Sequence, residues 1–252
     1  MDSASPHPRA AEFPRIAFLG FDGLLVSFGD RLSEPANRAA LAVRHALERE
    51  GWDGVEETTA SLVSTYVRFD PLAVEAAALR DRLAELVASR DWTTADLPAG
   101  RRLWRVPAVF GTDLAPQLAE AAALAGLTPE QAVAEIAATR LRVQTIGFAP
   151  GQPYLGELPD HWTIPRQTDL TPRVPVGALC VAIRQMTLFS VSTPTGWRHV
   201  AQTALRLFRP EAEAPFLLRP GDEVLFQPVD RAAHDRLRDE GTDGGAVAEA
   251  LR

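Results

Sequence analysis

Two arginines stand in proline-rich surroundings where their side chains could recognise an anion. Arg166 follows Pro165, and Arg173 lies between Pro172 and the Val174-Pro175 pair. Proline fixes the backbone angle φ, so it holds the neighbouring backbone in place. The planar guanidinium fork of arginine binds carboxylates and phosphates through two parallel hydrogen bonds. We therefore predict that Arg166 and Arg173 contact an anion or a partner protein, with a solvated surface position as the alternative for each.

His199 and Tyr154 are the candidates for proton transfer and for carbonyl binding. His199 follows Trp197 in a segment with strand composition, and histidine carries protons near neutral pH. Tyr154 could donate a hydrogen bond to a bound carbonyl, although simple packing is the alternative role for both side chains. The remaining histidines show no metal-ligand spacing with one another or with Cys180, so we expect no metal site. These histidines are His7, His45, His161 and His234.

The composition limits the classes of function that are open to the chain. Its 252 residues carry a net charge of −7, so nucleic acid is not expected as a partner. Every basic residue is an arginine, which excludes a P-loop lysine and a Schiff-base lysine. The single cysteine, Cys180, lies in an apolar run and is expected to be an inert core thiol. We find neither a membrane span nor a signal peptide, so we expect a cytoplasmic protein without membrane contacts.

One segment, residues 147–159, has an unusual composition and is expected to shape the site. It reads GFAPGQPYLGELP, with three prolines and three glycines among large apolar residues. Proline removes a backbone donor, and glycine permits positive φ and close backbone approach. We predict a shaped loop that is neither a helix nor a central strand, with Gly151 and Tyr154 as candidate binding residues at the mouth of the fold. A buried structural turn is the alternative.

The first part of the chain is predicted to be a small α/β sandwich domain over residues 14–92, after a disordered leader over 1–13. Apolar runs around Asp22-Gly23 indicate a hairpin. A helix is expected over 35–50, capped by Ser33 and ended by Gly51. A strand over 62–69 and a second helix over 71–89 follow. Residues 93–102 are predicted to be a linker.

The second part, residues 103–230, is predicted to be a small β-barrel that includes two helices. A strand over 103–110 precedes a helix over 114–124. Thr128, Pro129 and Gln131 form a capping box for a helix that ends near Ala138. A strand over 141–146 leads into residues 147–159. Short strands with intervening turns follow over 178–183, 188–191, 197–203, 204–208 and 223–228. Residues 231–252 are expected to be a tail or a frayed helix.

A series of motifs in a fixed order resembles one family. GFAPGQPYLGELP is followed by IPR, RVPVG, TPTGW, LRLF and RPGDEVLF, and the first domain adds LVSFGD and YVRFDPL. The series resembles the family of the B-type subunit of 5-oxoprolinase, the Kip-type inhibitor of a sporulation histidine kinase (KipI) and allophanate hydrolase subunit 1, which contains carboxyltransferase subdomains C and D. The resemblance spans roughly residues 15 to 230.

The resemblance implies an α+β fold, with the N-terminal α/β domain followed by a cyclophilin-like β-barrel. It implies a non-autonomous subunit of an ATP-dependent amidohydrolase that opens a cyclic amide such as 5-oxoproline. The implied partners are a homologous second barrel subunit and a lamB/YcsF-like subunit, with ATP held in the complex. The same family also allows a regulator that binds a histidine kinase, or a diverged scaffold without chemistry.

The chain departs from the family pattern in the segment VAIRQMTLFS, residues 181–190. Gln185 is retained from that pattern, whereas Ile183 and Arg184 stand where the family has glycine and asparagine. Gln185 and Arg184 are therefore added to the candidates for substrate or anion binding. The family also has a histidine on the helix that precedes residues 147–159, and in this chain Ile136 stands at that position.

Overall fold

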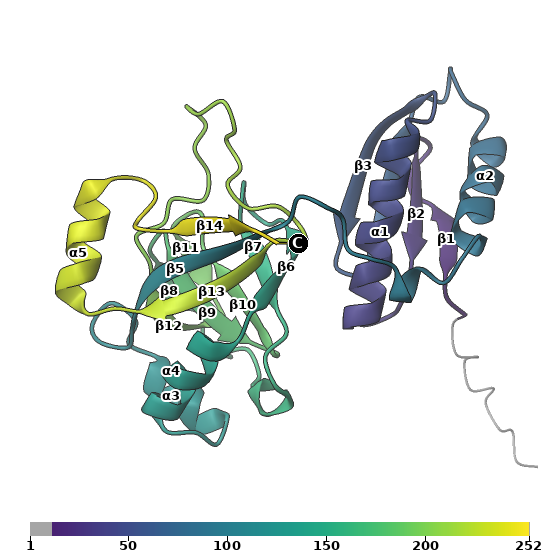
Figure 1. Cartoon of the computed structure of the whole chain (residues 1–252). Helices are drawn as coiled ribbons and strands as arrows, with labels where there is room; N and C mark the ends of the chain where they lie inside the picture. The colour runs from purple at the N-terminus through teal and green to yellow at the C-terminus, as the bar shows by residue number, and fades with distance from the viewer. Residues whose placement is uncertain (1–11, 252) are drawn as a thin grey trace, which may run out of the picture. The chain divides into compact units, whose positions relative to one another are not determined.

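A computed structural model describes residues 12–251 and divides the chain into two compact units between Leu97 and Pro98 (Figure 1). Most of the expected leader over 1–13 lies outside the described residues. Each unit has its own sheet and its own hydrophobic core. Within the expected linker over 93–102, Ala95 is buried in the first core and the first strand of the second unit already begins at Arg102.

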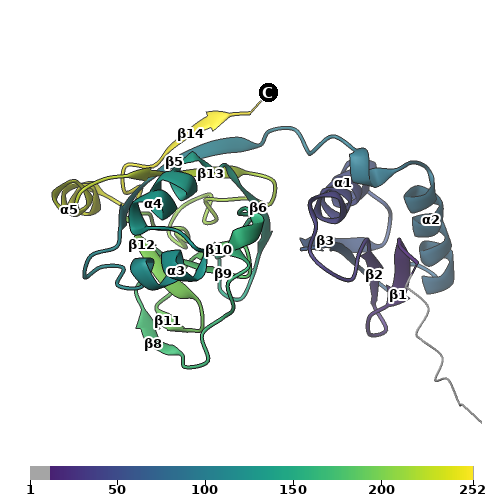
Figure 2. The ribbon, with the colours of Figure 1, turned by 90° about the horizontal axis from the view of Figure 1, so that it is seen from below.

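The first unit is a four-stranded antiparallel sheet in the order β1-β2-β4-β3. Leu24, Val26, Val67 and Phe69 of this sheet share one core with apolar residues of both helices. Figure 2 shows how α1 and α2 lie against the sheet. The elements are β1 Arg15–Phe18, β2 Gly23–Ser27, α1 Glu34–Glu50, β3 Val55–Ser61, β4 Ser64–Phe69, α2 Ala76–Ala88 and the short 3-10 helix η1 Trp92–Thr94.

The bounds of α1 agree with those expected from its capping residues, whereas α2 and β4 begin later than expected. Ser33 accepts from the Ala36 backbone, and Gly51 ends the helix at φ 58°. The helix expected from residue 71 begins only at Ala76, because Asp70 binds the following backbone amides and delays the helix start. The strand expected over 62–69 begins at Ser64, since Leu62 takes a positive φ in the turn from β3.

The second unit contains a closed seven-strand barrel, which confirms the α+β fold class. Its sheet follows the order β12-β9-β10-β7-β6-β13-β5, and pairing of β12 with β5 closes it. The strands are β5 Arg102–Phe110, β6 Leu141–Ile146, β7 Pro153–Gly156, β9 Ala178–Ala182, β10 Gln185–Leu188, β12 Arg198–Gln202 and β13 Glu223–Pro228. A separate ribbon pairs β8 Thr171–Val174 with β11 Thr193–Thr195.

The main core of this unit gathers alternate residues of the barrel strands. The helices α3 Leu118–Leu124 and α4 Pro129–Ala138 add apolar side chains to it. The predicted capping box of α4 is present in full, with Thr128 and Gln131 bonded reciprocally. Helix α3 begins later than residue 114, because Pro116 and a turn closed by Ala115 and Gly111 occupy that stretch. Strand residues of this core include Val106, Val143, Leu155, Leu179, Val181, Val200 and Phe226.

The expectation for residues 147–159 is wrong in one respect, because the segment contains a central strand. β7 lies between β6 and β10 and pairs antiparallel with both. Pro153 is tolerated because it is the first residue of the strand, where a missing donor costs least. Gly156 is required by close approach, since a Cβ there would lie 2.7 Å from the Gln144 side-chain oxygen.

Other strand boundaries also differ from those expected. The strand expected over 188–191 lies at 185–188, and 204–208 forms only an isolated bridge between Phe208 and Phe216. Residues 231–251 are more ordered than a tail. They form α5 Arg231–Glu240 and β14 Val247–Ala250, which pairs antiparallel with β5.

Candidate functional site

Polar side chains gather on one face of the barrel sheet, which we call the polar face. Strand register places Tyr154 opposite Thr187, Thr187 opposite Cys180, and Cys180 opposite His199. Directly opposed residues share a face, so this row crosses β7, β10, β9 and β12. A bulge that follows His199 brings Gln202 to the same face.

A small apolar cluster covers the middle of the polar face. Val174 of the β8–β11 ribbon packs with Trp197 and Phe189 on Cys180 and its neighbours. Burial raises the pKa of the Cys180 thiol, so this side chain is a poor nucleophile. Chemistry on this face is therefore left to the polar groups on either side of the cluster.

On one side of the cluster, Tyr154 and Arg166 lie close to each other. The Tyr154 ring meets the Trp197 ring edge-on, with 5.9 Å between centroids. Burial raises the pKa of Tyr154, while a hydrogen bond from Gln152 and the charge of Arg166 act in the opposite direction. The phenol is therefore protonated at neutral pH and can donate a hydrogen bond to a ligand oxygen.

The guanidinium of Arg166 is free to bind a ligand, whereas most arginines of the barrel are engaged by protein groups. Among the described residues, no hydrogen bond or ion pair engages its exposed guanidinium. Its backbone is nevertheless held, because the Gln167 amide donates to the Gly196 carbonyl over 2.7 Å. A positioned cation without a carboxylate partner beside a phenol donor can bind a carboxylate or phosphate group.

On the other side of the cluster, His199 is only 4% exposed and its Nε2 has no hydrogen-bond partner among the described residues. Its backbone is clamped by Gln117, whose amide donates to the His199 carbonyl and whose side chain accepts from the His199 amide. Burial lowers the pKa of His199, opposed by contacts with the Ala201 backbone and the Gln202 side chain. A neutral imidazole with a free nitrogen can act as a base.

The depressed pKa of His199 makes stability depend on pH. Because the folded protein disfavours the charged imidazole, the stabilisation is present above the ordinary value of 6.5 and is lost as the pH falls towards the lower folded pKa. The unfolding free energy of the wild type should fall more steeply from about pH 7.5 to about pH 5.5 than that of His199→Gln. Urea unfolding at several pH values measures this, and parallel curves would contradict it.

Three other candidates lie apart from this arrangement. Arg173 donates from Nε to the Ser192 hydroxyl over 2.7 Å and lies elsewhere on the β8–β11 ribbon. Gly151 is buried at φ 71° and shapes the turn that precedes β7. Gln185 is buried and donates to Gln144 over 2.8 Å. Gly151 and Gln185 thus make structural contacts, whereas Arg173 has no carboxylate partner among the described residues.

Arg184 is occupied by local contacts. It forms ion pairs with Asp160 at 3.0 Å and Glu157 at 3.5 Å, and its Nε donates to the Leu158 carbonyl. With Ile183 it forms the two-residue turn between β9 and β10, and both residues have positive φ, 47° and 65°. Such turns favour asparagine and glycine, which are the residues that the family pattern has at these positions.

Relief of the backbone strain at Ile183 in this turn should stabilise the protein. A β-branched residue at positive φ is strained, so Ile183→Asn should raise the unfolding free energy by about 1 kcal/mol. Ile183→Val keeps the branched side chain and is the matched control, without a gain. Chemical denaturation of both variants measures the difference. A loss of stability in Ile183→Asn would show that contacts of the isoleucine side chain outweigh the strain.

Sequence reasoning misses the glutamines that surround the site. Gln117 donates to Gln167 over 2.6 Å, and Gln167 donates to the Trp197 carbonyl over 3.0 Å. This chain of amides links the start of α3, the ribbon and the strand of His199. No local pattern marks these residues, since Gln117 and Gln167 are 50 positions apart. Gln152, which contacts Tyr154, is the one such residue with a local signal, because it is the polar residue between Gly151 and Pro153.

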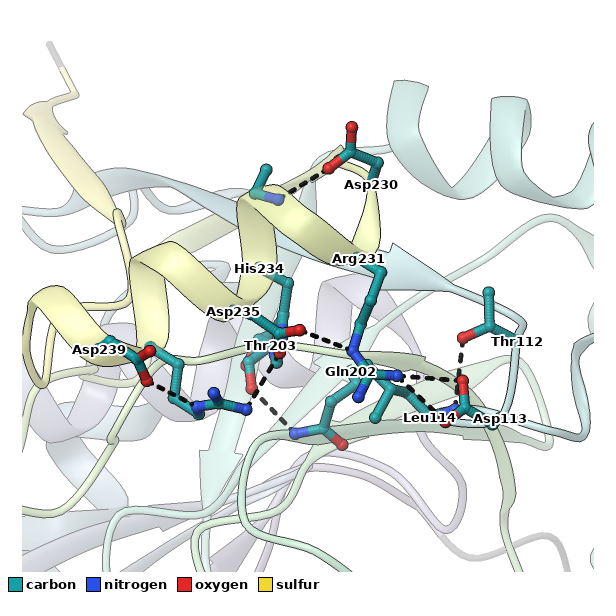
Figure 3. Close-up of polar contacts among 12 residues, drawn as sticks. Thr112, Asp113, Leu114, Gln202, Thr203, Asp230, Arg231, His234, Asp235 and Asp239 are labelled. Atoms are coloured by element: carbon teal, nitrogen blue, oxygen red, sulfur yellow. Dashed lines mark hydrogen bonds and ion pairs between the residues drawn. The ribbon is translucent and has the colours of Figure 1, made fainter.

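A second polar cluster lies at the start of α5 (Figure 3). Arg231 donates to Asp113 over 3.0 Å and to Asp235 over 2.9 Å. These hydrogen bonds lower the pKa of both carboxyl groups. The Gln202 side chain, also drawn there, donates to the Thr203 carbonyl over 2.9 Å. Because Arg231 is paired with both carboxylates, the cluster fixes α5 to the turn after β5, and Arg231 is not free to bind an anionic ligand.

The residues described in 12–251 contain no group of three or more histidine, cysteine, aspartate or glutamate side chains that could hold a metal ion. No helix within that range is long and apolar enough to cross a membrane. Arg166 and Arg173, which have no carboxylate partner among the described residues, could each bind a carboxylate or a phosphate group.

Comparison with known proteins identifies the family. Residues 14–218 match the family model for the carboxyltransferase domain, subdomain C and D, so the chain belongs to this family. It is 28% identical to the B-type subunit of 5-oxoprolinase from Bacillus subtilis (strain 168) over 240 residues, which are 90% of this chain and 97% of that protein. It is 39% identical to the B-type subunit of 5-oxoprolinase from Escherichia coli O157:H7 over 127 residues, 50% of this chain and 58% of that protein.

Two solved structures share the fold. The crystal structure of TTHA0988 has a TM-score of 0.69 and 31% identity, and the match covers 82% of this chain and 40% of that chain. The Kluyveromyces lactis urea carboxylase has a TM-score of 0.72 over 94% of this chain and 24% of its own, with 16% identity, and shows the fold alone. This chain therefore spans less than half the length of either solved chain.

Proposed function

We propose that this protein is the B-type subunit of an ATP-dependent complex that opens a cyclic amide, with 5-oxoproline as the substrate. The observation that carries this proposal is the match to the B-type subunit of the Bacillus subtilis 5-oxoprolinase, which spans 97% of that protein. Such a subunit acts in the cytoplasm with companion chains, and we propose a homologous barrel subunit and a lamB/YcsF-like subunit as those companions.

The polar face supplies groups that suit this substrate. 5-Oxoproline has a carboxylate and a lactam carbonyl, and an amide carbonyl is a poor electrophile until its oxygen is activated. ATP held in the complex would supply that activation by transfer of its γ-phosphoryl group to the oxygen with release of ADP, and water would then open the carbon–nitrogen bond with release of inorganic phosphate. In this chain, Arg166 would hold the carboxylate or a phosphate, and Tyr154 would donate to the carbonyl oxygen. Arg173 on the β8–β11 ribbon offers a second cation.

His199 is the candidate for proton transfer within this chain. Its buried Nε2 has no partner among the described residues, and burial keeps the imidazole neutral. A neutral imidazole can accept a proton from an attacking water and return it to the leaving nitrogen. Gln117 fixes the backbone at His199 from both sides, so it acts as a positioning residue.

The test is reconstitution of the complex. The purified chain, combined with the companion subunits of its host, ATP and 5-oxoproline, should release glutamate, ADP and inorganic phosphate together. Omission of any subunit should abolish release. Assembly of a complete complex without turnover would overturn the proposal and favour a scaffold without chemistry. Inhibition of a host histidine kinase by the chain alone would favour the regulatory alternative.

A further inference from the structure

Gln202 is a buried residue whose side-chain oxygen has a fixed direction. Only 6% of the residue is exposed. Its Nε2 donates to the Val176 carbonyl over 2.8 Å and to the Thr203 carbonyl over 2.9 Å, so both amide hydrogens are used. Figure 3 shows the nitrogen turned towards Thr203 and the oxygen turned away from it. Exchange of the two atoms would place the oxygen against two carbonyl oxygens, so this orientation is the only favourable one.

The backbone beside Gln202 is clamped to the turn before β9. The Thr203 amide donates to the Gly177 carbonyl over 2.9 Å, and the Thr203 hydroxyl donates to the same carbonyl over 3.1 Å. A Cβ on Gly177 would lie 2.3 Å from the Thr203 carbonyl oxygen and 3.0 Å from the Gln202 Nε2. Glycine is therefore required at this position, and the clamp holds the Gln202 amide in place.

The Gln202 oxygen and the His199 ring are neighbours on the polar face. The bulge after His199 brings both side chains to this face, and both residues are buried. The Gln202 side chain opposes the lowering of the His199 pKa, so its oxygen lies near the imidazole. Nevertheless, neither the Gln202 Oε1 nor the His199 Nε2 has a hydrogen-bond partner among the described residues. The two atoms are close without being bonded to each other.

The tautomer of His199 explains why these atoms are not bonded. The backbone at Ala201 raises the pKa of His199 through a hydrogen bond, so a ring N–H faces that backbone. Because Nε2 has no partner among the described residues, this hydrogen is on Nδ1. The neutral ring then keeps a lone pair at Nε2. Nε2 and the Gln202 Oε1 are therefore both acceptors, and two acceptors cannot bond to each other.

Two neighbouring buried acceptors need one donor that carries two hydrogens. Buried polar atoms without a protein partner are commonly bridged by an internal water molecule. A water molecule can donate one hydrogen to each acceptor and still keep its own lone pairs. We propose that the Gln202 Oε1 and the His199 Nε2 hold one internal water molecule between them, which we call the bridging water.

The catalytic role of the bridging water rests on the proposed function. An attacking water must lose a proton as its oxygen bonds to the activated carbonyl carbon. The bridging water takes up that proton and releases one of its own to Nε2, so the bridging water is restored and the imidazole becomes charged. The reverse transfer delivers the proton to the leaving nitrogen. Gln202 is thus a positioning residue, because it orients the water through which His199 exchanges its proton.

The wild-type chain tests the water site without ATP, substrate or companion subunits. At about pH 8 the imidazole is neutral, and long-range ¹H–¹⁵N magnetic resonance spectra should place the His199 hydrogen on Nδ1. His199→Phe identifies the signal through its loss. A crystal structure that resolves ordered water should show a water oxygen about 2.7–3.2 Å from both acceptors. A hydrogen on Nε2, or no water between the two atoms, would overturn the proposal.

Variants of two glutamines test the role of Gln202 in proton transfer. Gln202→Leu has no acceptor, so it should lose the bridging water and lower kcat of the reconstituted complex about tenfold with KM unchanged. Gln227 is exposed on β13, and Gln227→Leu is the matched control with wild-type kinetics. If Gln202→Leu does not fold, the wild-type spectra and crystal structure still decide whether the water is held.

Unchanged kcat in Gln202→Leu would overturn the proton route through the bridging water. A complete wild-type complex that is itself inactive would instead overturn the proposed function, and the water site would stand on the spectra and the crystal structure of the isolated chain.

Discussion

Replacement of Arg166 by alanine should lower kcat/KM of the reconstituted complex by about a hundredfold, mainly through a higher KM. A charge-assisted hydrogen-bond pair to a carboxylate contributes about 1.5–3 kcal/mol, and every 1.4 kcal/mol is a factor of about ten. Because the guanidinium has no partner of its own among the described residues, its removal leaves no unpaired carboxylate and little change in stability. Steady-state kinetics with varied 5-oxoproline measures the effect.

Two further variants separate the charge from its geometry. Arg166→Lys keeps the cation but loses the planar fork, so it should fall between the wild type and alanine. Arg236 is also exposed and has no ion pair among the described residues, so Arg236→Ala is the matched control and should be fully active. If Arg166→Ala has the same kcat/KM as the wild type, Arg166 does not bind the substrate and the prediction is wrong.

Replacement of Asp222 by alanine should have the largest effect on stability. The Asp222 side chain is 2% exposed and accepts from the amide and the guanidinium of Arg102, from the Trp104 indole and from the Arg219 amide. Loss of one partner of a buried ion pair costs about 3–5 kcal/mol, because the other charge is left uncompensated. Urea unfolding of the full chain, followed by tryptophan fluorescence, measures the loss.

The same measurement has a milder variant and a control. Asp222→Asn keeps the shape of the side chain and one acceptor oxygen, so this variant should fold and lose less unfolding free energy than Asp222→Ala. The control is Asp239→Ala, because Asp239 pairs with Arg238 at the surface. This replacement should change the unfolding free energy by less than about 0.5 kcal/mol. Equal effects of Asp222→Ala and Asp239→Ala would contradict the role assigned to the buried carboxylate.

Features decided by neighbouring residues could be predicted from the sequence. The cap at Ser33, the left-handed Gly51 and the capping box at Thr128 all appear as expected, since the groups that form them lie within one helical turn. The β1–β2 hairpin is confirmed for the same reason. The family, and with it the barrel, was recognisable from the order of the motifs.

Features decided by distant partners could not be predicted. Residues 153–156 form a central strand because β6 and β10 lie on either side, and their composition alone argues against it. Asp222 carries only a turn signal in the sequence, since its partner Arg102 is 120 positions away. Tyr154 and Arg166 are both candidates from the sequence, but their proximity depends on a loop that is held by the hydrogen bond from the Gln167 amide to the distant Gly196 carbonyl.

The position of β5 has a consequence for how the molecule forms. Among the described residues, this first strand of the barrel pairs with β12, β13 and β14, which follow the other barrel strands in the sequence. The barrel must therefore wait for nearly its whole chain before β5 is paired, and such long-range closure makes folding slow. Until then β5 is an unpaired apolar edge, and the nascent chain is most exposed to aggregation in this interval.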